Sequence, residues 1–261
     1  MKTLTIVITL LITQLSIAQE SDNLGKMILK GREGIKGALN TADVNLLMGQ
    51  RDYFLDLLKT NENAEMVHYY IGYTDYEIGI RYLFQQNKKS AKKHIYEGIE
   101  HLEKAIKLKD DFAEAYALLS SLLVYKIDNL SILSAFGSGS KAKKYIEKAL
   151  ELEPENPRVL FIAGYITYYT KEVYGGDKEK GLKYFQKSVD AFETYNPPQR
   201  FYPDWGIVRA NYHLGFSNME LGNLDEAQKC FEKVLEMSPD NFFSQVALAD
   251  LEKKKAGKKG E

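Results

Sequence analysis

Residues Gly222–Asn241 read GNLDEAQKCFEKVLEMSPDN, and this pattern recurs along the chain. Its apolar residues return at helical spacing and form one stripe, while charged residues cover the other side. Asn223 is suited to cap the start of the helix, and Glu226, three residues later, is placed to complete a capping box. Pro239 ends the helix, because the residue before a proline is displaced from the α region. So wide an apolar face predicts a helix that packs against neighbouring helices.

Three further copies of this helix precede it in the chain. They read YIEKALELEPENP at Tyr145–Pro157, HLEKAIKLKDDFAEAY at His101–Tyr116 and, more weakly, GLKYFQKSVDAFE at Gly181–Glu193. Their spacing falls within the range of roughly 20–50 residues that is typical of solenoids and repeat arrays. Four equivalent small or apolar positions mark the copies: Ala105, Ala149, Ser188 and Val234.

Each copy is accompanied by a second helical segment. These segments are Ala64–Tyr76, Ala113–Tyr125, Arg158–Thr170 and Val208–Gly222. A small residue inside a helix costs stability, so its recurrence at matching places predicts a close approach between the paired helices. The small residues are Gly72, Ser120, Gly164 and Gly215.

These paired segments resemble the tetratricopeptide repeat family, whose unit is a helix–turn–helix of 34 residues. The match is strongest over Val208–Asn241, although Asn211 and Asn218 stand where large apolar residues are usual, and the earlier units have longer connections. The resemblance implies an all-α, right-handed superhelical solenoid of antiparallel helix pairs. In such a solenoid one continuous apolar seam is expected, which here would run through Leu102, Ala149 and Phe231.

The expected organisation has four parts. Residues 1–18 have the positive start, the apolar middle and the small residues before a cut after Ala18 that are typical of a secretory signal peptide. We therefore expect an exported protein, periplasmic or secreted, that is not an integral membrane protein after cleavage. Residues 19–63 are interpreted as a degenerate helical hairpin, 64–241 as about four repeat units, and 242–261 as a capping helix with a basic tail.

Two segments interrupt the helical pattern. The stretch Asp128–Ser140, DNLSILSAFGSGS, is interpreted as a loop between the helices of the second unit, with a flexible Gly/Ser end. The stretch Tyr195–Pro203, YNPPQRFYP, contains three prolines and breaks the pattern firmly. Because Phe201, Tyr202 and Trp205 are large and apolar, we expect burial there rather than a free linker.

Composition excludes several classes of function. Lysine plus arginine number 35 against 36 acidic residues, closely interspersed, so nucleic acid is not an expected partner. Cys230 is the only cysteine and is interpreted as a small buried hydrophobe, which leaves no internal disulfide. His94 and His101 stand too far apart along one helix to share a metal ion. We expect no catalytic residues, no metal and no cofactor, and Asp177 after two glycines is interpreted as a helix cap.

The family resemblance points to a surface instead of an active site. In tetratricopeptide proteins the first helix of each unit lines the concave face, where partners bind. Aromatic stripes at helical spacing are more often core than binding surface, but tyrosine tolerates partial exposure and exposed aromatic patches mark interaction sites. By register, the lining would comprise Tyr69, Tyr73, Tyr76, Ser121, Tyr125, Phe161, Tyr165, Tyr168, Tyr169, Tyr212 and Phe216, with Arg158 and Arg209 at the rim.

Two functions follow from this reading. The first is an exported, non-enzymatic scaffold that binds a protein or peptide in the aromatic groove. The second is a periplasmic protein that binds a small or lipid-like ligand, similar to the tetratricopeptide proteins associated with solute transporters. An open groove would favour the first function and a closed, tyrosine-lined pore the second. A hidden enzyme ranks third, and the sequence does not assign the oligomeric state.

Overall fold

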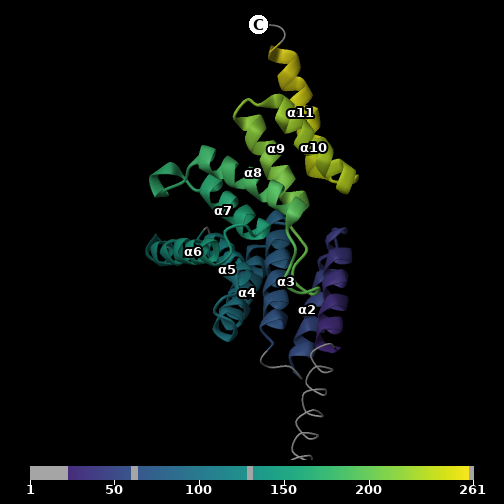
Figure 1. Ribbon diagram of the computed structural model, residues 1–261, viewed down its shortest axis with the longest axis vertical. Helices are drawn as coiled ribbons and strands as arrows, with labels where there is room; N and C mark the ends of the chain where they lie inside the picture. The colour runs from purple at the N-terminus through teal and green to yellow at the C-terminus, as the bar shows by residue number, and fades with distance from the viewer. Residues whose placement is uncertain (1–22, 60–63, 128–131, 259–261) are drawn as a thin grey trace, which may run out of the picture. The chain divides into compact units, whose positions relative to one another are not determined.

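The computed structural model describes residues 23–59, 64–127 and 132–258, and within these ranges it contains helices and no strand (Figure 1). The predicted signal peptide lies outside the described residues. None of the described helices has the length and apolarity that a membrane crossing requires. After a helix over residues 23–39 come α2 (Val44–Leu58), α3 (Glu65–Phe84), α4 (Lys88–Leu108), α5 (Ala113–Ile127), α6 (Ile132–Leu152), α7 (Pro157–Tyr169), the short 3-10 helix η1 (Glu172–Tyr174), α8 (Lys178–Thr194), α9 (Ile207–Glu220), α10 (Leu224–Met237) and α11 (Phe242–Lys258).

Four antiparallel helix pairs carry the fold, and they are the pairs that the repeats predict. The most extensive packing joins α3 to α4, α5 to α6, α7 to α8 and α9 to α10. At Gly164 of α7, an added Cβ atom would lie 2.8 Å from the Phe185 ring of α8, and at Gly215 of α9 it would lie 2.8 Å from the Phe231 ring of α10. The small residues therefore permit the close approach inferred from their recurrence, and the all-α class of paired helices is confirmed.

The chain divides into two compact units. The N-terminal unit comprises residues up to Lys109 together with Pro197–Pro203, and the C-terminal unit comprises Asp110–Asn196 and Asp204 onward. Leu102 belongs to the first unit, whereas Ala149 and Phe231 belong to the second. The single seam expected through these three residues is therefore corrected: each unit has its own buried core, and the division falls between α4 and α5.

Two local expectations are wrong. Asn223 begins α10 without a side-chain cap; its side-chain Nδ2 donates to Asn218 Oδ1 at 3.1 Å. The segment interpreted as a loop at Asp128–Ser140 is helical from Ile132 onward, and its first residues, 128–131, lie outside the described residues. The cap predicted at Asp177 is confirmed, since its side chain accepts from the Lys180 amide at 2.8 Å.

Candidate interaction surface

Aromatic side chains from four helices of the C-terminal unit form one connected set. Its members lie on α5, α7, α9 and α11, which are the first helices of successive pairs and the final helix. Most of them belong to the lining predicted by register. We call this set the aromatic ladder: Tyr125, Phe161, Tyr165, Tyr168, Tyr169, Tyr212, His213, Phe216, Phe242 and Phe243.

His213 of α9 connects the ladder to α7. Its ring centroid lies 5.3 Å from that of Tyr165 and 5.5 Å from that of Tyr169. Its Nδ1 atom is 2.8 Å from the Tyr169 hydroxyl, and the Tyr165 hydroxyl lies 2.9 Å from that of Tyr125 on α5. Pairs of rings at these distances stabilise one another beyond their buried area, so the ladder is a packed element with fixed ring positions.

The ladder carries no charge near neutral pH. Burial among the rings, and secondarily the positive charge of Arg209, lowers the pKa of His213 to about 3. Burial is also the main cause that raises the pKa values of Tyr168, Tyr169 and Tyr212 above the usual tyrosine value. The imidazole is therefore neutral and these three phenols keep their protons.

Several members of the ladder and one neighbouring residue are open to solvent. Tyr169 is 43% exposed, and Phe242 and Phe243 at the start of α11 are 67% and 52% exposed. Val246, one turn further along α11, is 43% exposed. Phe161 and Tyr168 are buried beneath the rings that face outward. The ladder therefore has a buried base and several exposed rings, and its role as a binding surface stays a prediction.

The ladder ends at a cleft between the last turns of α7 and α9. The cleft has a volume of about 380 Å³ and combines aromatic walls with charged side chains. The Tyr168 hydroxyl donates to Glu220 at 2.6 Å, and Lys178 Nζ donates to the same carboxylate at 3.1 Å. These hydrogen bonds, that of Tyr168 first, lower the pKa of Glu220. The lining residues are Tyr168, Tyr169, Thr170, Lys171, Glu172, Asp177, Lys178, Phe216 and Glu220.

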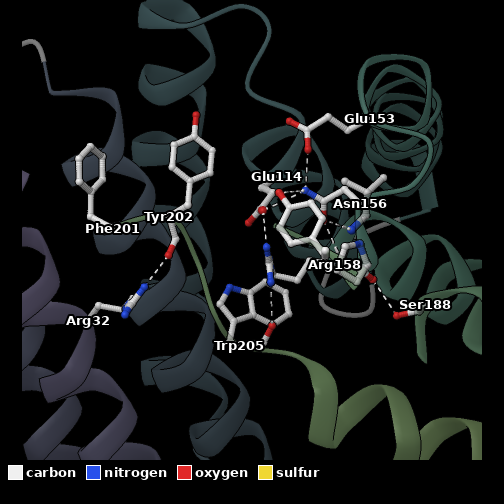
Figure 2. A network of polar contacts seen from close by, with 12 residues as sticks. Arg32, Glu114, Glu153, Asn156, Arg158, Ser188, Phe201, Tyr202 and Trp205 are labelled. Atoms are coloured by element: carbon white, nitrogen blue, oxygen red, sulfur yellow. Dashed lines mark hydrogen bonds and ion pairs between the residues drawn. The ribbon is translucent and has the colours of Figure 1, made fainter. Parts of the chain in front are cut away.

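A buried polar network fixes the start of α7 (Figure 2). Arg158 Nη2 donates to Glu114 Oε1 at 2.8 Å, and Asn156 Nδ2 donates to the same oxygen at 3.0 Å. Asn156 also caps α7, because its Oδ1 accepts from the amides of Arg158 and Val159. The side chains of Arg158 and Glu114 are only 3% and 1% exposed. The rim placement expected for Arg158 is therefore corrected, whereas Arg209 is half-buried in the first turn of α9.

The tyrosines of α3, which were predicted to line the groove in the first repeat, are packed inside the N-terminal unit. Tyr69 is fully buried, Tyr73 is 3% exposed and Tyr76 is 8% exposed. Nearby on the same helix, His68 lies with its Nδ1 atom 3.0 Å from that of His101 on α4. Burial and the neighbouring His68 lower the pKa of His101 to about 4. In this unit the predicted stripe is core, and the exposed aromatic strip belongs to the C-terminal unit.

One cluster of side chains of the types that bind metal ions was not predicted from the sequence. The packing of α3 against α4 brings Asp75, His94 and Glu97 together, with one potential ligand atom of each within 4.8 Å of the others. Arg51 of α2 occupies this group, since its Nε donates to Asp75 at 2.6 Å and its Nη2 to Glu97 at 2.9 Å. A guanidinium held by both carboxylates is the arrangement of a buried ion-pair network.

Comparison with known proteins assigns the family. A family model described as "Regulator of microtubule dynamics protein 1-3" matches residues 38–256. The chain belongs to this family. Regulator of microtubule dynamics protein 3 of Mus musculus is 24% identical over 160 residues, which are 59% of this chain and 34% of the mouse protein. The Rattus norvegicus protein is 24% identical over 149 residues, 55% of this chain and 31% of the rat protein. The chain thus spans about a third of the length of these curated relatives.

Several solved structures share the helical repeat fold of this chain. The thermophilic TPR protein TTC0263 of Thermus thermophilus has a TM-score of 0.61 at 16% identity, covering 87% of this chain and 98% of that one. The HusA haemophore of Porphyromonas gingivalis has a TM-score of 0.60 at 22% identity, covering 77% and 93%. At these identities the likeness establishes the fold, which agrees with the resemblance drawn from the repeats.

Proposed function

We propose that this chain is a non-enzymatic scaffold that binds a polypeptide partner along the aromatic ladder of the C-terminal unit. The observation that carries the proposal is the exposure of Tyr169, Phe242 and Phe243, which are connected through ring contacts to a buried aromatic base. Fixed aromatic groups lose little conformational freedom on binding and supply much of the energy at interfaces. The neutral ring surface suits the apolar side chains of a bound segment.

A peptide-display library tests this proposal with random peptides in place of a chosen partner. Peptides selected on the wild-type chain are titrated, as labelled synthetic peptides, against Phe242→Ser/Phe243→Ser. We expect their affinity to fall by at least about 30-fold, because truncation of an interface hot spot costs about 2 kcal/mol or more. Phe84→Ser is the matched control, since Phe84 is 72% exposed but lies in the N-terminal unit. An equal loss of peptide affinity in both variants, or an unchanged affinity in both, would refute the ladder as the binding surface.

The family description suggests one partner to test directly. We propose polymerised tubulin as a candidate because the family is named for the regulation of microtubule dynamics. In a co-sedimentation assay, the wild-type chain is expected to pellet with microtubules, and Phe242→Ser/Phe243→Ser is expected to stay in the supernatant. A wild-type chain that stays in the supernatant over a range of salt concentrations would exclude tubulin.

An exported chain would not meet cytosolic tubulin; as the alternative to that partner, we propose that residues 1–18 direct export, because of their three-part composition. The measurement is the intact mass of the mature chain recovered from cells that process it. A mature chain that begins at Gln19 supports export and places the partner outside the cytosol. A mature chain that retains residues 1–18 refutes export and leaves cytosolic partners such as tubulin accessible.

A second candidate function is the binding of a small, amphipathic ligand. The observation that favours it is the cleft at the end of α7 and α9, where aromatic walls and Lys178 lie together. Native mass spectrometry of the purified chain would detect a ligand that remains bound. If this function is correct, Lys178→Met lowers ligand occupancy, whereas Phe242→Ser/Phe243→Ser leaves it unchanged. The reverse pattern would assign binding to the ladder instead.

A further inference from the structure

Residues Pro197–Pro203 belong to a different unit from the residues on either side of them. The segment joins α8 to α9, which are helices of the C-terminal unit, yet it is part of the N-terminal unit. Its centre is a turn, in which the Tyr202 amide donates to the Gln199 carbonyl at 3.0 Å. Prolines at both ends restrict the backbone and lower the entropy lost when the turn is held in place.

Side chains of the N-terminal unit bind three successive backbone carbonyls of this turn. Arg32 Nη1 donates to the carbonyl of Arg200 at 2.9 Å. It also donates to the carbonyl of Tyr202 at 2.8 Å (Figure 2). The Tyr70 hydroxyl donates to the carbonyl of Phe201 between them at 2.8 Å. Hydrogen bonds from a charged guanidinium are stronger than those between neutral groups. The backbone of the turn is therefore recognised whatever its side chains are.

Packing within the N-terminal unit fixes the positions of the two donor side chains, Arg32 and Tyr70. Tyr70 is fully buried in α3, and its ring stacks on Phe54 with centroids 5.1 Å apart and planes 11° from parallel. Arg32 lies within the helix over residues 23–39 and is only 16% exposed. Donors with fixed positions add to affinity, because little freedom is lost when the ligand binds.

The aromatic side chains of the turn also have defined places. Tyr202 is 5% exposed, its hydroxyl accepts from Lys109 Nζ at 2.7 Å, and the same ammonium group lies 5.5 Å from its ring centroid. A Cβ atom at Gly25 would lie 2.9 Å from the Phe201 ring, so glycine at this position leaves room for the ring. Both aromatic side chains of the turn are thus in contact with residues of the N-terminal unit.

We infer that the N-terminal unit carries a docking site for a short, proline-flanked aromatic turn, and that residues 197–203 are its resident ligand. The site takes a polypeptide segment whose chemistry is that of PPQRFYP, with two aromatic side chains and three accessible carbonyls. A segment tethered to its own site has an effective concentration in the millimolar range. The same sequence supplied as a separate peptide therefore binds only when the resident segment is removed. This inference does not depend on the ladder.

A full-length variant in which residues 199–202 are replaced by Gly-Ser-Gly-Ser tests the site. The probe is a fluorescein-labelled peptide PPQRFYP, followed by fluorescence anisotropy. We expect it to bind this variant at least about tenfold more tightly than the wild-type chain, in which the site is filled. Arg32→Ala in the same variant, or a PPQRAAP peptide, is expected to lose at least about tenfold in affinity. A helical, cooperatively melting variant that binds PPQRFYP no better than PPQRAAP would overturn the inference.

A second measurement keeps the resident segment intact and needs no loop replacement. Trypsin cleaves after Arg200, whose carbonyl is held by Arg32. We expect Arg32→Ala to accelerate cleavage at this bond by at least about tenfold relative to other sites, because local opening governs proteolysis. Lys36→Ala is the matched control, since Lys36 is exposed on the same helix. Equal cleavage rates after Arg200 in wild type, Arg32→Ala and Lys36→Ala would contradict the role of Arg32 and overturn the inference.

Discussion

Replacement of Arg158 by methionine is the perturbation whose effect on stability follows most directly from the structure. The guanidinium lies against Glu114 at 2.8 Å and 4.9 Å from the centroid of the Tyr195 ring, and both charged side chains are almost fully buried. Methionine keeps much of the apolar stem but removes the positive charge. The Glu114 carboxylate would then lie in an apolar interior without that charge beside it.

Removal of one member of a buried ion pair costs about 3–5 kcal/mol. Asn156 continues to donate to the same carboxylate oxygen, so we expect the lower end of this range, about 3 kcal/mol. With a urea dependence of about 2 kcal/mol per molar, the midpoint of unfolding falls by about 1.5 M. The double variant Arg158→Met/Glu114→Leu removes both charges of this pair, and we expect at least half of the loss to be recovered.

The assay is urea unfolding followed by tryptophan fluorescence. Trp205 is the only tryptophan, it belongs to the C-terminal unit, and its ring lies 6.5 Å from that of Phe161, so its emission reports on that unit. Lys148→Met is the control, because its pair with Glu151 is exposed and contributes less than about 1 kcal/mol. An Arg158→Met variant within about 1 kcal/mol of wild type would refute the reasoning.

Three further predictions concern the same unit. The pKa of His213 is about 3 in the folded chain and about 6.5 in the unfolded chain, so the free energy of unfolding falls as the pH falls below 6.5. The loss at pH 5 is about 2 kcal/mol. Unfolding curves at pH 7 and pH 5 should show that His213→Gln abolishes this loss. Gly181→Ala should lower the free energy of unfolding by about 1–3 kcal/mol, because the added Cβ would lie 2.6 Å from the Cβ of Tyr168. Gly137→Ala should raise it by about 0.5–1 kcal/mol, because an added Cβ there meets no atom within 4 Å. Thermal melts that rank the two variants in the opposite order would contradict this. Partial burial raises the pKa of the Cys230 thiol to about 11. Mass spectrometry should therefore show alkylation by iodoacetamide at pH 8 more than about tenfold slower than that of an unhindered thiol, and equal rates would contradict the raised pKa.

The helix pairs could be predicted from sequence because their signals are local and repeated. The apolar stripe at 222–241 predicts the helical period and the need for a packing partner, and the recurring small residues predict that paired helices approach closely. Helices α3 to α10 are paired in this way. Single residues were less predictable. Asn223 does not cap α10 with its side chain, which is instead hydrogen-bonded to Asn218, a residue of the preceding helix. The Gly/Ser stretch before Lys141 is helical, which shows that intrinsic propensity is a weak guide when the helix has a packing partner.

The candidate site could be predicted in part. Register alone placed Tyr165, Tyr168 and Tyr212 on neighbouring first helices, and the structure brings their rings into one ladder. Phe242 and Phe243 were missed because α11 was interpreted only as a cap, although two adjacent phenylalanines at the start of a terminal helix are a usable signal. The turn at 197–203 could not have been assigned to the N-terminal unit, since the contacts of Arg32 and Tyr70 with it are far apart in sequence.

A repeat register can also reveal buried polar pairs. Glu114 and Arg158 are both the second residue of a first helix, α5 and α7, in successive units. Equivalent positions of neighbouring repeats lie side by side, because each repeat packs on the next. Opposite charges at such positions therefore predict an ion pair between repeats, which the rim placement of Arg158 overlooked.

Hydrogen exchange of the full chain with and without a display-selected peptide tests the central claim most directly. If the aromatic ladder is the binding surface, peptide binding should slow amide exchange in α7, α9 and the first turns of α11, and it should leave α2 and the helix at 23–39 unchanged. Protection confined to the N-terminal unit, or to the second helices α8 and α10, would contradict the claim.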